Sequence, residues 1–298
     1  MSPLTGGTLT LTQRDRRFGY LLTAPGLAVL VAVVTFPLFF TIFTSFYDYT
    51  LLTPNHDTFI GGENYQEAAE EEYLPGSLWV TVKFVLASVV IEFIIGFIVA
   101  LSLNATERFK TVYYLILLAP LLINPVVVGL LWRMLLHSEL GIVNYAIGLV
   151  GIRPVSWLGD PTIAFWTVVL TDIWHQVSFM AILLLAGLSA LPREPYEAAR
   201  MDGASPLRCF FYITLPLMQP VIAVALLLRM IFAIKTFDIV FIMTKGGPGT
   251  ATDLISYFIY RAAFFGLDIG RASAMAVGLL IIIIVLTAFL YRYMRSLN

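Results

Sequence analysis

Residues 77–103 read SLWVTVKFVLASVVIEFIIGFIVALSL, and Lys83 and Glu92 are the only charged residues in this run. A bilayer core of about 30 Å is crossed by roughly 20 helical residues that rise about 1.5 Å each. The run is therefore long enough to cross a membrane as a helix. A transmembrane β-strand would instead show about ten residues of alternating polarity. This stretch predicts a membrane-spanning helix.

Five other stretches have the same apolar character. They lie at approximately residues 20–46, 112–136, 163–188, 213–242 and 273–293. The chain is 59% hydrophobic and 12% charged, against roughly 45–50% and about 25% in soluble domains. This balance excludes a disordered chain, a coiled coil and an ordinary soluble enzyme. We expect an all-α membrane protein with six transmembrane helices.

Several classes of site are excluded by residue type and spacing. Cys209 is the only cysteine, so an intrachain disulfide and a multi-cysteine metal site are impossible. The three histidines lie far apart, and no His-Glu-x-x-His or Gly-x-Ser-x-Gly pattern occurs. A formal net charge of −1 gives no basic footprint for nucleic acid. We therefore expect no catalytic residue, no metal ligand and no nucleic-acid partner.

The loops differ in charge between the two sides of the membrane. With six spans, both termini share a side, and that side holds ten Lys and Arg residues against four on the other. The positive-inside rule then places both termini in the cytoplasm, with residues 1–19 as an N-terminal tail. The outer loop between the first two spans is acidic over residues 48–72. Such a loop is either a solvated surface or a docking face for an external partner.

The cytoplasmic loop 190–216 between the fourth and fifth spans is rich in local signals. Pro195 suits the first turn of a helix, and Gly203 suits the position after its end, where a positive φ costs glycine little. Ser205 can then cap a second helix that has Pro206 in its first turn. The loop predicts a helix over residues 196–202, a glycine turn and a second short helix. Ala198 and Ala199 give the first helix a slim patch that another surface could approach closely.

The same loop resembles the signature loop of ABC importer permeases. The pattern runs Glu197-Ala198-Ala199, Gly203, Ile213 and Leu215-Pro216 at the spacing of that family. Residues 59–65 and 243–249 also resemble segments of carbohydrate permeases of the maltose and glycerol-3-phosphate type. The chain is therefore identified as similar to inner-membrane permeases of binding-protein-dependent carbohydrate importers.

This resemblance implies an architecture and a set of partners. Residues 20–298 would form one six-span permease domain that binds no cofactor, while ATP and Mg²⁺ bind to separate subunits. The partners would be a second related permease, two ATP-binding subunits and an external solute-binding protein, all in or at the inner membrane of a prokaryote. The resemblance assigns ATPase coupling to Glu197, Ala198, Ala199, Arg200, Asp202, Gly203, Leu215 and Pro216.

Polar residues inside spans are costly and usually face a cavity or another helix. A sugar has polar edges and apolar faces, so its site combines polar side chains with aromatic rings. The candidates for the solute pathway are Asp172, Trp174, His175, Gln176, Phe179, Arg229, Phe232 and Asp238. Packing between helices is the alternative role for these residues, and for Arg229 and Asp238 an interhelical ion pair is equally natural.

Other functions remain as alternatives. The solute could be glycerol-3-phosphate, a polyol or another small molecule, and an anionic solute would favour a role for Arg229 or Lys235. A stand-alone secondary transporter would show inverted repeats between its halves, and no such symmetry is evident in the sequence. The leading interpretation is a permease subunit that carries a sugar, such as a di- or oligosaccharide.

Overall fold

The computed structural model describes residues 11–52, 58–106 and 108–295, and nearly all of its regular structure is helical. Of the expected N-terminal tail, residues 1–10 lie outside the described part, and the first helix begins at Leu11. The helices are α1 (Leu11–Thr44), α2 (Glu63–Glu70), α3 (Leu74–Ala105), α4 (Lys110–Leu121), α5 (Pro125–Leu135), α6 (Ile142–Leu149), α7 (Pro161–Ser189), α8 (Glu194–Met201), α9 (Pro206–Cys209), the π-helix η1 (Phe210–Thr214), α10 (Leu215–Ile234), α11 (Asp238–Met243), α12 (Ile255–Phe264) and α13 (Ile269–Arg295). Two-residue strands β1 (Tyr47–Asp48) and β2 (Thr58–Phe59) pair antiparallel.

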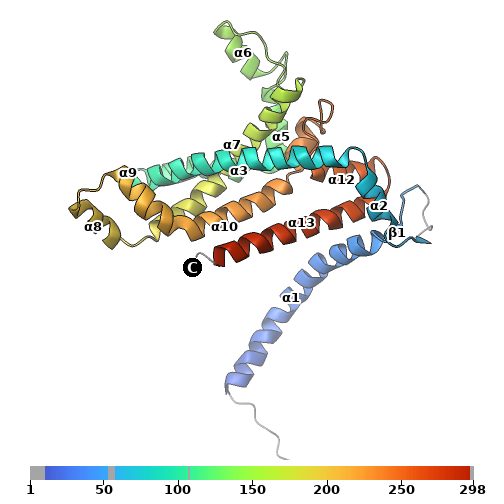
Figure 1. Cartoon of the computed structure of the whole chain (residues 1–298), viewed down its shortest axis with the longest axis horizontal. Coiled ribbons are helices and arrows are strands. Elements are labelled where there is room, and N and C mark those ends of the chain that lie inside the picture. Colours follow the sequence, from blue (N-terminus) through green and yellow to red (C-terminus); the bar gives the residue numbers. More distant parts are fainter. Residues whose placement is uncertain (1–10, 53–57, 107, 296–298) are drawn as a thin grey trace, which may run out of the picture.

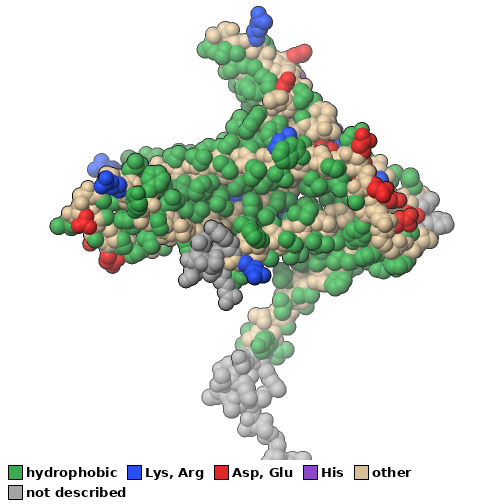
Figure 2. All heavy atoms as spheres, viewed as in Figure 1, with side chains coloured by type: hydrophobic (Ala, Val, Ile, Leu, Met, Phe, Trp, Pro, Cys, Tyr) green, Lys and Arg blue, Asp and Glu red, His purple; other side chains and the backbone are tan. Residues whose placement is uncertain are grey.

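The long helices α3, α7, α10 and α13 run side by side as a bundle (Figure 1). The short helices α8 and α9 lie at one end of the bundle, and α2, α12 and β1 lie at the other. Figure 2 shows hydrophobic side chains over the middle of the molecule, with charged side chains gathered mainly at its ends. This distribution fits a bundle that crosses a membrane, and the predicted all-α membrane fold is confirmed.

Within the described residues, five segments are long and apolar enough to span a membrane. They are Phe18–Thr44, Leu74–Ala105, Pro161–Ser189, Pro206–Met243 and Ile269–Arg292. The pair α4 and α5 adds a sixth only if the two helices count as one span, because they are bent by 88° at a short break. The sequence predicted one continuous run over residues 112–136, and the structure interrupts it.

The break between α4 and α5 has a local cause. Pro125 carries no backbone N–H, so it cannot donate to the carbonyl four residues earlier. Asn124 has extended backbone angles, and its side chain accepts a hydrogen bond from the Val126 amide at 2.9 Å. These two residues therefore begin a new helix instead of continuing the old one.

The predicted run over residues 213–242 is interrupted as well. Helix α10 ends at Ile234, and the six-residue helix α11 starts at Asp238 after a three-residue gap. The segments that follow the two breaks pack on each other. A Cβ added to Gly129 of α5 would lie 3.0 Å from the Cβ of Ile242, and Arg133 Nη1 donates to the Ile242 carbonyl at 2.9 Å. Helices α5 and α11 therefore form one paired unit.

The centre of the bundle is the packing of α3, α7 and α10. Phe97, Ala100, Met180, Leu184 and Met218 are buried there in one apolar cluster. Gly96 lets α3 approach α7, because a Cβ at this position would lie only 2.8 Å from Met180 Cγ. Close approach through small residues is how membrane helices gain packing energy without a hydrophobic driving force.

Candidate functional site

The loop that joins α7 to α10 has the local structure predicted from the sequence. Helix α8 covers Glu194–Met201, and Ser205 accepts a hydrogen bond from the Arg208 amide as the cap of α9. Pro195 and Pro206 each lie in the first turn of their helix. The predicted helix, turn and second helix are therefore confirmed as local structure, and the coupling role of the loop remains a prediction.

Gly203 ends α8 through a defined hydrogen-bond pattern. The Ala204 amide donates to the Ala199 carbonyl at 2.9 Å, and the Gly203 amide donates to the Arg200 carbonyl at 3.0 Å. These two bonds form a Schellman motif, which needs a left-handed residue after the helix. Gly203 has a φ of +74°. A residue with a Cβ would be strained in this conformation.

The loop presents its side chains outward. No residue of α8 is buried, and Met201 keeps 88% of its surface exposed. Of the eight predicted coupling residues, only Ala199 and Leu215 are half-buried, and the other six are exposed. The Tyr196 hydroxyl and Thr214 Oγ1 lie 3.0 Å apart and connect α8 to η1, just before the start of α10. A displacement of α8 would therefore be passed to a membrane-spanning helix.

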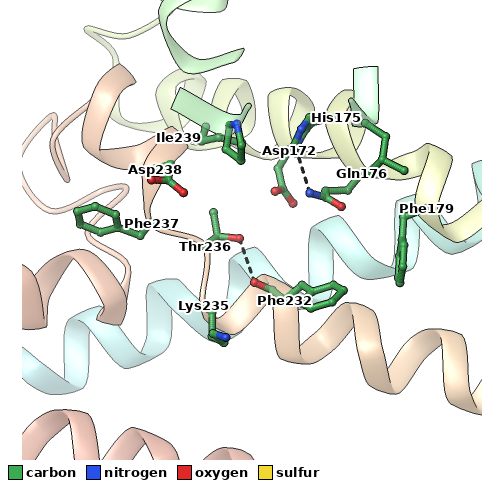
Figure 3. Close-up of a pocket in the computed structure, with 12 residues that line it drawn as sticks. Asp172, His175, Gln176, Phe179, Phe232, Lys235, Thr236, Phe237, Asp238 and Ile239 are labelled. Carbon is green, nitrogen blue, oxygen red and sulfur yellow. Dashed lines mark hydrogen bonds between the residues drawn. The ribbon is translucent and has the colours of Figure 1, made fainter. Parts of the chain in front are cut away.

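A cavity of about 320 Å³ lies in the middle of the bundle, between the two helix breaks. Figure 3 shows the residues around it. From α7 it is lined by Asp172, His175, Gln176 and Phe179, and from the α10–α11 region by Phe232, Lys235, Thr236, Phe237, Asp238 and Ile239. Leu121 and Pro125, which flank the first break, complete the lining. The cavity combines aromatic walls with hydrogen-bonding groups.

A buried cluster of charges lies beside this cavity. Arg229 of α10 donates to both carboxylate oxygens of Glu92 on α3, one of them at 2.8 Å, and also to Asp172 on α7. Arg229 is 1% exposed and Glu92 is fully buried. Removing one partner of such a cluster leaves a charge unpaired in a medium that solvates it poorly. The cluster therefore ties the three central helices together.

The cavity contains six of the eight predicted pathway residues. The other two, Trp174 and Arg229, do not line it. Trp174 packs edge-on against Trp132 with ring centroids 5.6 Å apart, and Arg229 is held by its two carboxylates. An interhelical ion pair was an alternative for Arg229, and the structure forms it with Glu92 and Asp172 in place of Asp238. The pattern of one sequence could not select these partners, which are 137 and 57 residues away.

Sequence reasoning gave Lys235 a role only for an anionic solute, and it left the other lining residues outside the proposed pathway: Leu121, Pro125, Thr236, Phe237 and Ile239. Lys235 and Thr236 could have been predicted to line a cavity, because polar residues between apolar runs often do so. The apolar lining residues gave no such signal, since apolar residues are typical of any span; they are Leu121, Pro125, Phe237 and Ile239. They reach the cavity because the chain breaks beside them.

The acidic end of the molecule is held by ion pairs. Arg271 lies 3.2 Å from Glu71 and 3.2 Å from Asp268. Asp253, a fully buried residue of the 244–254 loop, accepts hydrogen bonds from Ser77 and Arg261. Burial raises the pKa of Asp253 above its ordinary value of 3.8, and Arg261 opposes that rise. Residues 53–57, which belong to the predicted acidic loop, lie outside the described part of the chain.

The fold and the site together define a class of protein. A bundle of apolar helices carries an open polar and aromatic cavity, and an exposed helix at one end is connected to a span that lines this cavity. In the described residues, no group of three His, Cys, Asp or Glu side chains could hold a metal ion. These features are those of a membrane transport component.

Comparison with known proteins identifies the family. The family model described as binding-protein-dependent transport system inner membrane component matches residues 92–298. The chain belongs to this family, as the resemblance predicted. It is a multi-pass component of the inner membrane and a non-catalytic permease component of ABC importers.

Relatives match over nearly the whole chain. The trehalose/maltose transport system permease protein MalF of Thermococcus litoralis is 37% identical over 270 residues, 91% of each chain. The sulfoquinovosyl glycerol transport system permease protein SmoG of Agrobacterium fabrum is 37% identical and covers 95% of this chain and 92% of its own. The sn-glycerol-3-phosphate transport system permease protein UgpA of Salmonella typhimurium is 30% identical, with 95% and 96% covered.

A solved structure has the same fold. It is a chain in the crystal structure of a bacterial ABC transporter that imports the acidic polysaccharide alginate. The TM-score is 0.81 at 23% identity, and the match covers 95% of this chain and 98% of that one. A second structure of a bacterial alginate ABC transporter holds a periplasmic protein bound to an alginate pentasaccharide.

Proposed function

We propose that this chain is one permease of an ATP-driven importer and forms the solute pathway together with a second, related permease. The importer has two ATP-binding subunits, and one of them docks on α8. ATP and Mg²⁺ bind to those subunits, and an external binding protein delivers the solute. The observation that carries the proposal is the exposed helix α8, ended by Gly203 and joined through Tyr196 and Thr214 to the segment that leads into α10. Closure of the ATP-binding pair would move this helix and bias the bundle between two states.

The orientation follows from the same proposal. Helix α8 and both termini face the cytoplasm, and α2, α12 and the acidic loop face outward. Residues 1–19 form a cytoplasmic tail, and residues 20–298 form one permease domain. The excess of Lys and Arg on the α8 side supports this orientation.

We propose that the solute is a neutral, hydroxyl-rich molecule such as a di- or oligosaccharide. Figure 3 shows carboxylates of Asp172 and Asp238 and the amide of Gln176 directed toward one space, while the Lys235 side chain points away from them. Asp172 is buried and held by Arg229. The oxygens of Asp238 and Gln176 accept hydrogen bonds, so they suit hydroxyl donors, and Phe179 and Phe232 offer flat apolar surfaces.

A phosphate monoester suits this cavity less well. Arg229 would be the natural phosphate ligand, but it is buried and already held by two carboxylates. The proposed solute therefore resembles that of the trehalose/maltose relative more than that of the glycerol-3-phosphate relative.

The first experiment is purification of the tagged chain from its native membrane in mild detergent, with identification of the subunits that accompany it. We expect a second permease and an ATPase, and we expect Glu197→Ala to release the ATPase. Glu67→Ala is the matched control, because Glu67 is an exposed residue of α2, another helix of eight residues at the opposite end of the bundle. A chain that purifies alone and transports in liposomes without ATP would establish a secondary transporter instead.

The solute class is tested by uptake of radiolabelled trehalose, maltose and sn-glycerol-3-phosphate in cells that carry the complete importer. We expect uptake of at least one of the two sugars and none of the phosphate ester. Uptake of glycerol-3-phosphate that is lost in Lys235→Met would overturn the neutral-solute proposal.

A further inference from the structure

His175 faces the break between α4 and α5. Its Nε2 lies 3.0 Å from the carbonyl oxygen of Ile123, which lies in the break. His175 is 3% exposed. In the part of the chain that the structure describes, His175 is the only partner found for this carbonyl.

Both ring nitrogens of His175 are engaged. A carbonyl can only accept, so Nε2 carries the hydrogen in this contact. The other nitrogen, Nδ1, lies 3.0 Å from Gln176 Nε2 and accepts from it (Figure 3). Both ring nitrogens are thus occupied, and none is left for a solute. The amide of Gln176 is fixed by the same contact, with its carbonyl oxygen free to face the cavity.

The break cannot be held by the backbone alone. Pro125 donates nothing, and the Val126 amide is taken by the Asn124 side chain. A carbonyl without a partner inside a membrane is unfavourable because no water solvates it there, so we expect the Ile123 carbonyl to rely on His175. The break in turn sets the direction of α5, which is tied to α11 through Arg133 and the Ile242 carbonyl.

We infer that His175 is a positioning residue of the solute site, an inference that rests on the proposed function. It fixes the α4–α5 break through Ile123, and it fixes the Gln176 amide that faces the solute. Its contribution to uptake acts through these two groups and involves no direct contact between a ring nitrogen and the solute.

The test compares three variants of the full chain in the purified importer: His175→Ala, His175→Gln and His137→Ala. The glutamine can still donate to the Ile123 carbonyl. His137 is the matched control, because its ring accepts only from the nearby Glu139 and Leu140 amides at the end of α5. The first readout is hydrogen–deuterium exchange over residues 118–128. The second is trehalose and maltose uptake per assembled complex, with the complex quantified by its co-purified subunits.

We expect His175→Ala to raise exchange over residues 118–128 and to lower uptake per complex at least tenfold. His175→Gln should recover both to within about threefold, and His137→Ala should change neither. A residue that only stabilised the fold would lower the amount of complex and leave uptake per complex unchanged, and that result would overturn the inference. Unchanged exchange in His175→Ala would also overturn it. If the wild-type chain carries neither sugar, the proposed solute class fails, and the exchange measurement still decides the role of His175.

Discussion

Helices α6 and α8 have the same length and end in the same way, yet their surroundings differ. Each has eight residues, and each is followed by a glycine with positive φ, Gly151 at +81° and Gly203 at +74°. After α6 the Ile152 amide donates to the Ile147 carbonyl and the Gly151 amide donates to the Gly148 carbonyl, as in the motif after α8. The way a helix ends is therefore local chemistry and does not by itself identify a site.

The two helices differ in charge and in how they are attached. Residues 140–152 around α6 contain no charged side chain, and the helix stands on an arm away from the bundle (Figure 1). Helix α8 carries two acidic residues in its first turn and a basic residue in its last. It is joined to the segment before α10, which lines the cavity. The comparison teaches that connection to a membrane-spanning helix, more than local structure, makes a short helix a candidate coupling element.

The largest expected effect comes from replacing the glycine that ends each helix. Gly203→Pro should lower uptake at least tenfold, because proline is restricted to a φ near −65° and cannot adopt +74°. Gly151→Pro disturbs an equivalent turn and should leave uptake within about twofold of wild type. Uptake and ATP hydrolysis are measured on the same preparations, and hydrolysis should continue in Gly203→Pro without transport. Equal losses in both variants would remove α8 from the coupling role.

The local structure of the loop 190–216 could be predicted almost completely from the sequence. Gly203, Ser205 and Pro206 act on backbone groups within a few residues of themselves, so their effects can be read locally. The apolar runs were also predicted well, since a span is a property of about 20 adjacent residues. The structure confirms this local part of the fold.

The site in the membrane could be predicted only in part. The α7 residues of the cavity share one helical face, and that spacing identified Asp172, His175, Gln176 and Phe179 together. Proline is a known source of helix kinks, so Pro125 carries a local signal for the break, but the contact between His175 and the Ile123 carbonyl joins residues 52 positions apart. Contacts over such distances are set by tertiary packing and leave no periodic signal.

The second largest expected effect is a loss of stability at the buried charge cluster, in contrast to α8, where the expected effect is on transport. Arg229→Met leaves Glu92 and Asp172 buried without a countercharge, and removal of one partner from a buried ion pair costs about 3–5 kcal/mol. Glu92→Gln still leaves one carboxylate paired with one guanidinium, so this variant should lose less stability than Arg229→Met. Thermal unfolding in detergent measures both variants, and Gly203→Pro serves as the control that alters transport with little change in melting temperature. An Arg229→Met chain as stable as wild type would contradict the role of the cluster.

Asn144 should show that the α6 arm is held independently of the α8 loop. Its side chain donates to the carbonyls of Ser138 and Val155 and accepts from the Val155 amide and the Trp157 indole. Asn144→Ala leaves these groups unpaired, at about 1–3 kcal/mol for each one that water cannot reach. We expect faster proteolysis over residues 137–160 with unchanged protection of the α8 loop. Increased cleavage in both regions would show that the two ends are coupled.

The smallest expected effect tests the single hydrogen bond that connects α8 to η1. Tyr196→Phe removes the hydroxyl that contacts Thr214 Oγ1 and keeps the ring, so the loss should be about 0.5–1 kcal/mol. Because 1.4 kcal/mol corresponds to about a tenfold change in an equilibrium, we expect roughly a two- to fivefold rise in ATP hydrolysed per molecule transported. Tyr145→Phe is the matched control, since Tyr145 lies on the exposed surface of α6 and keeps 69% of its surface exposed. A ratio that changes equally in both variants would mean that α8 transmits its motion through the backbone of residues 202–210 alone.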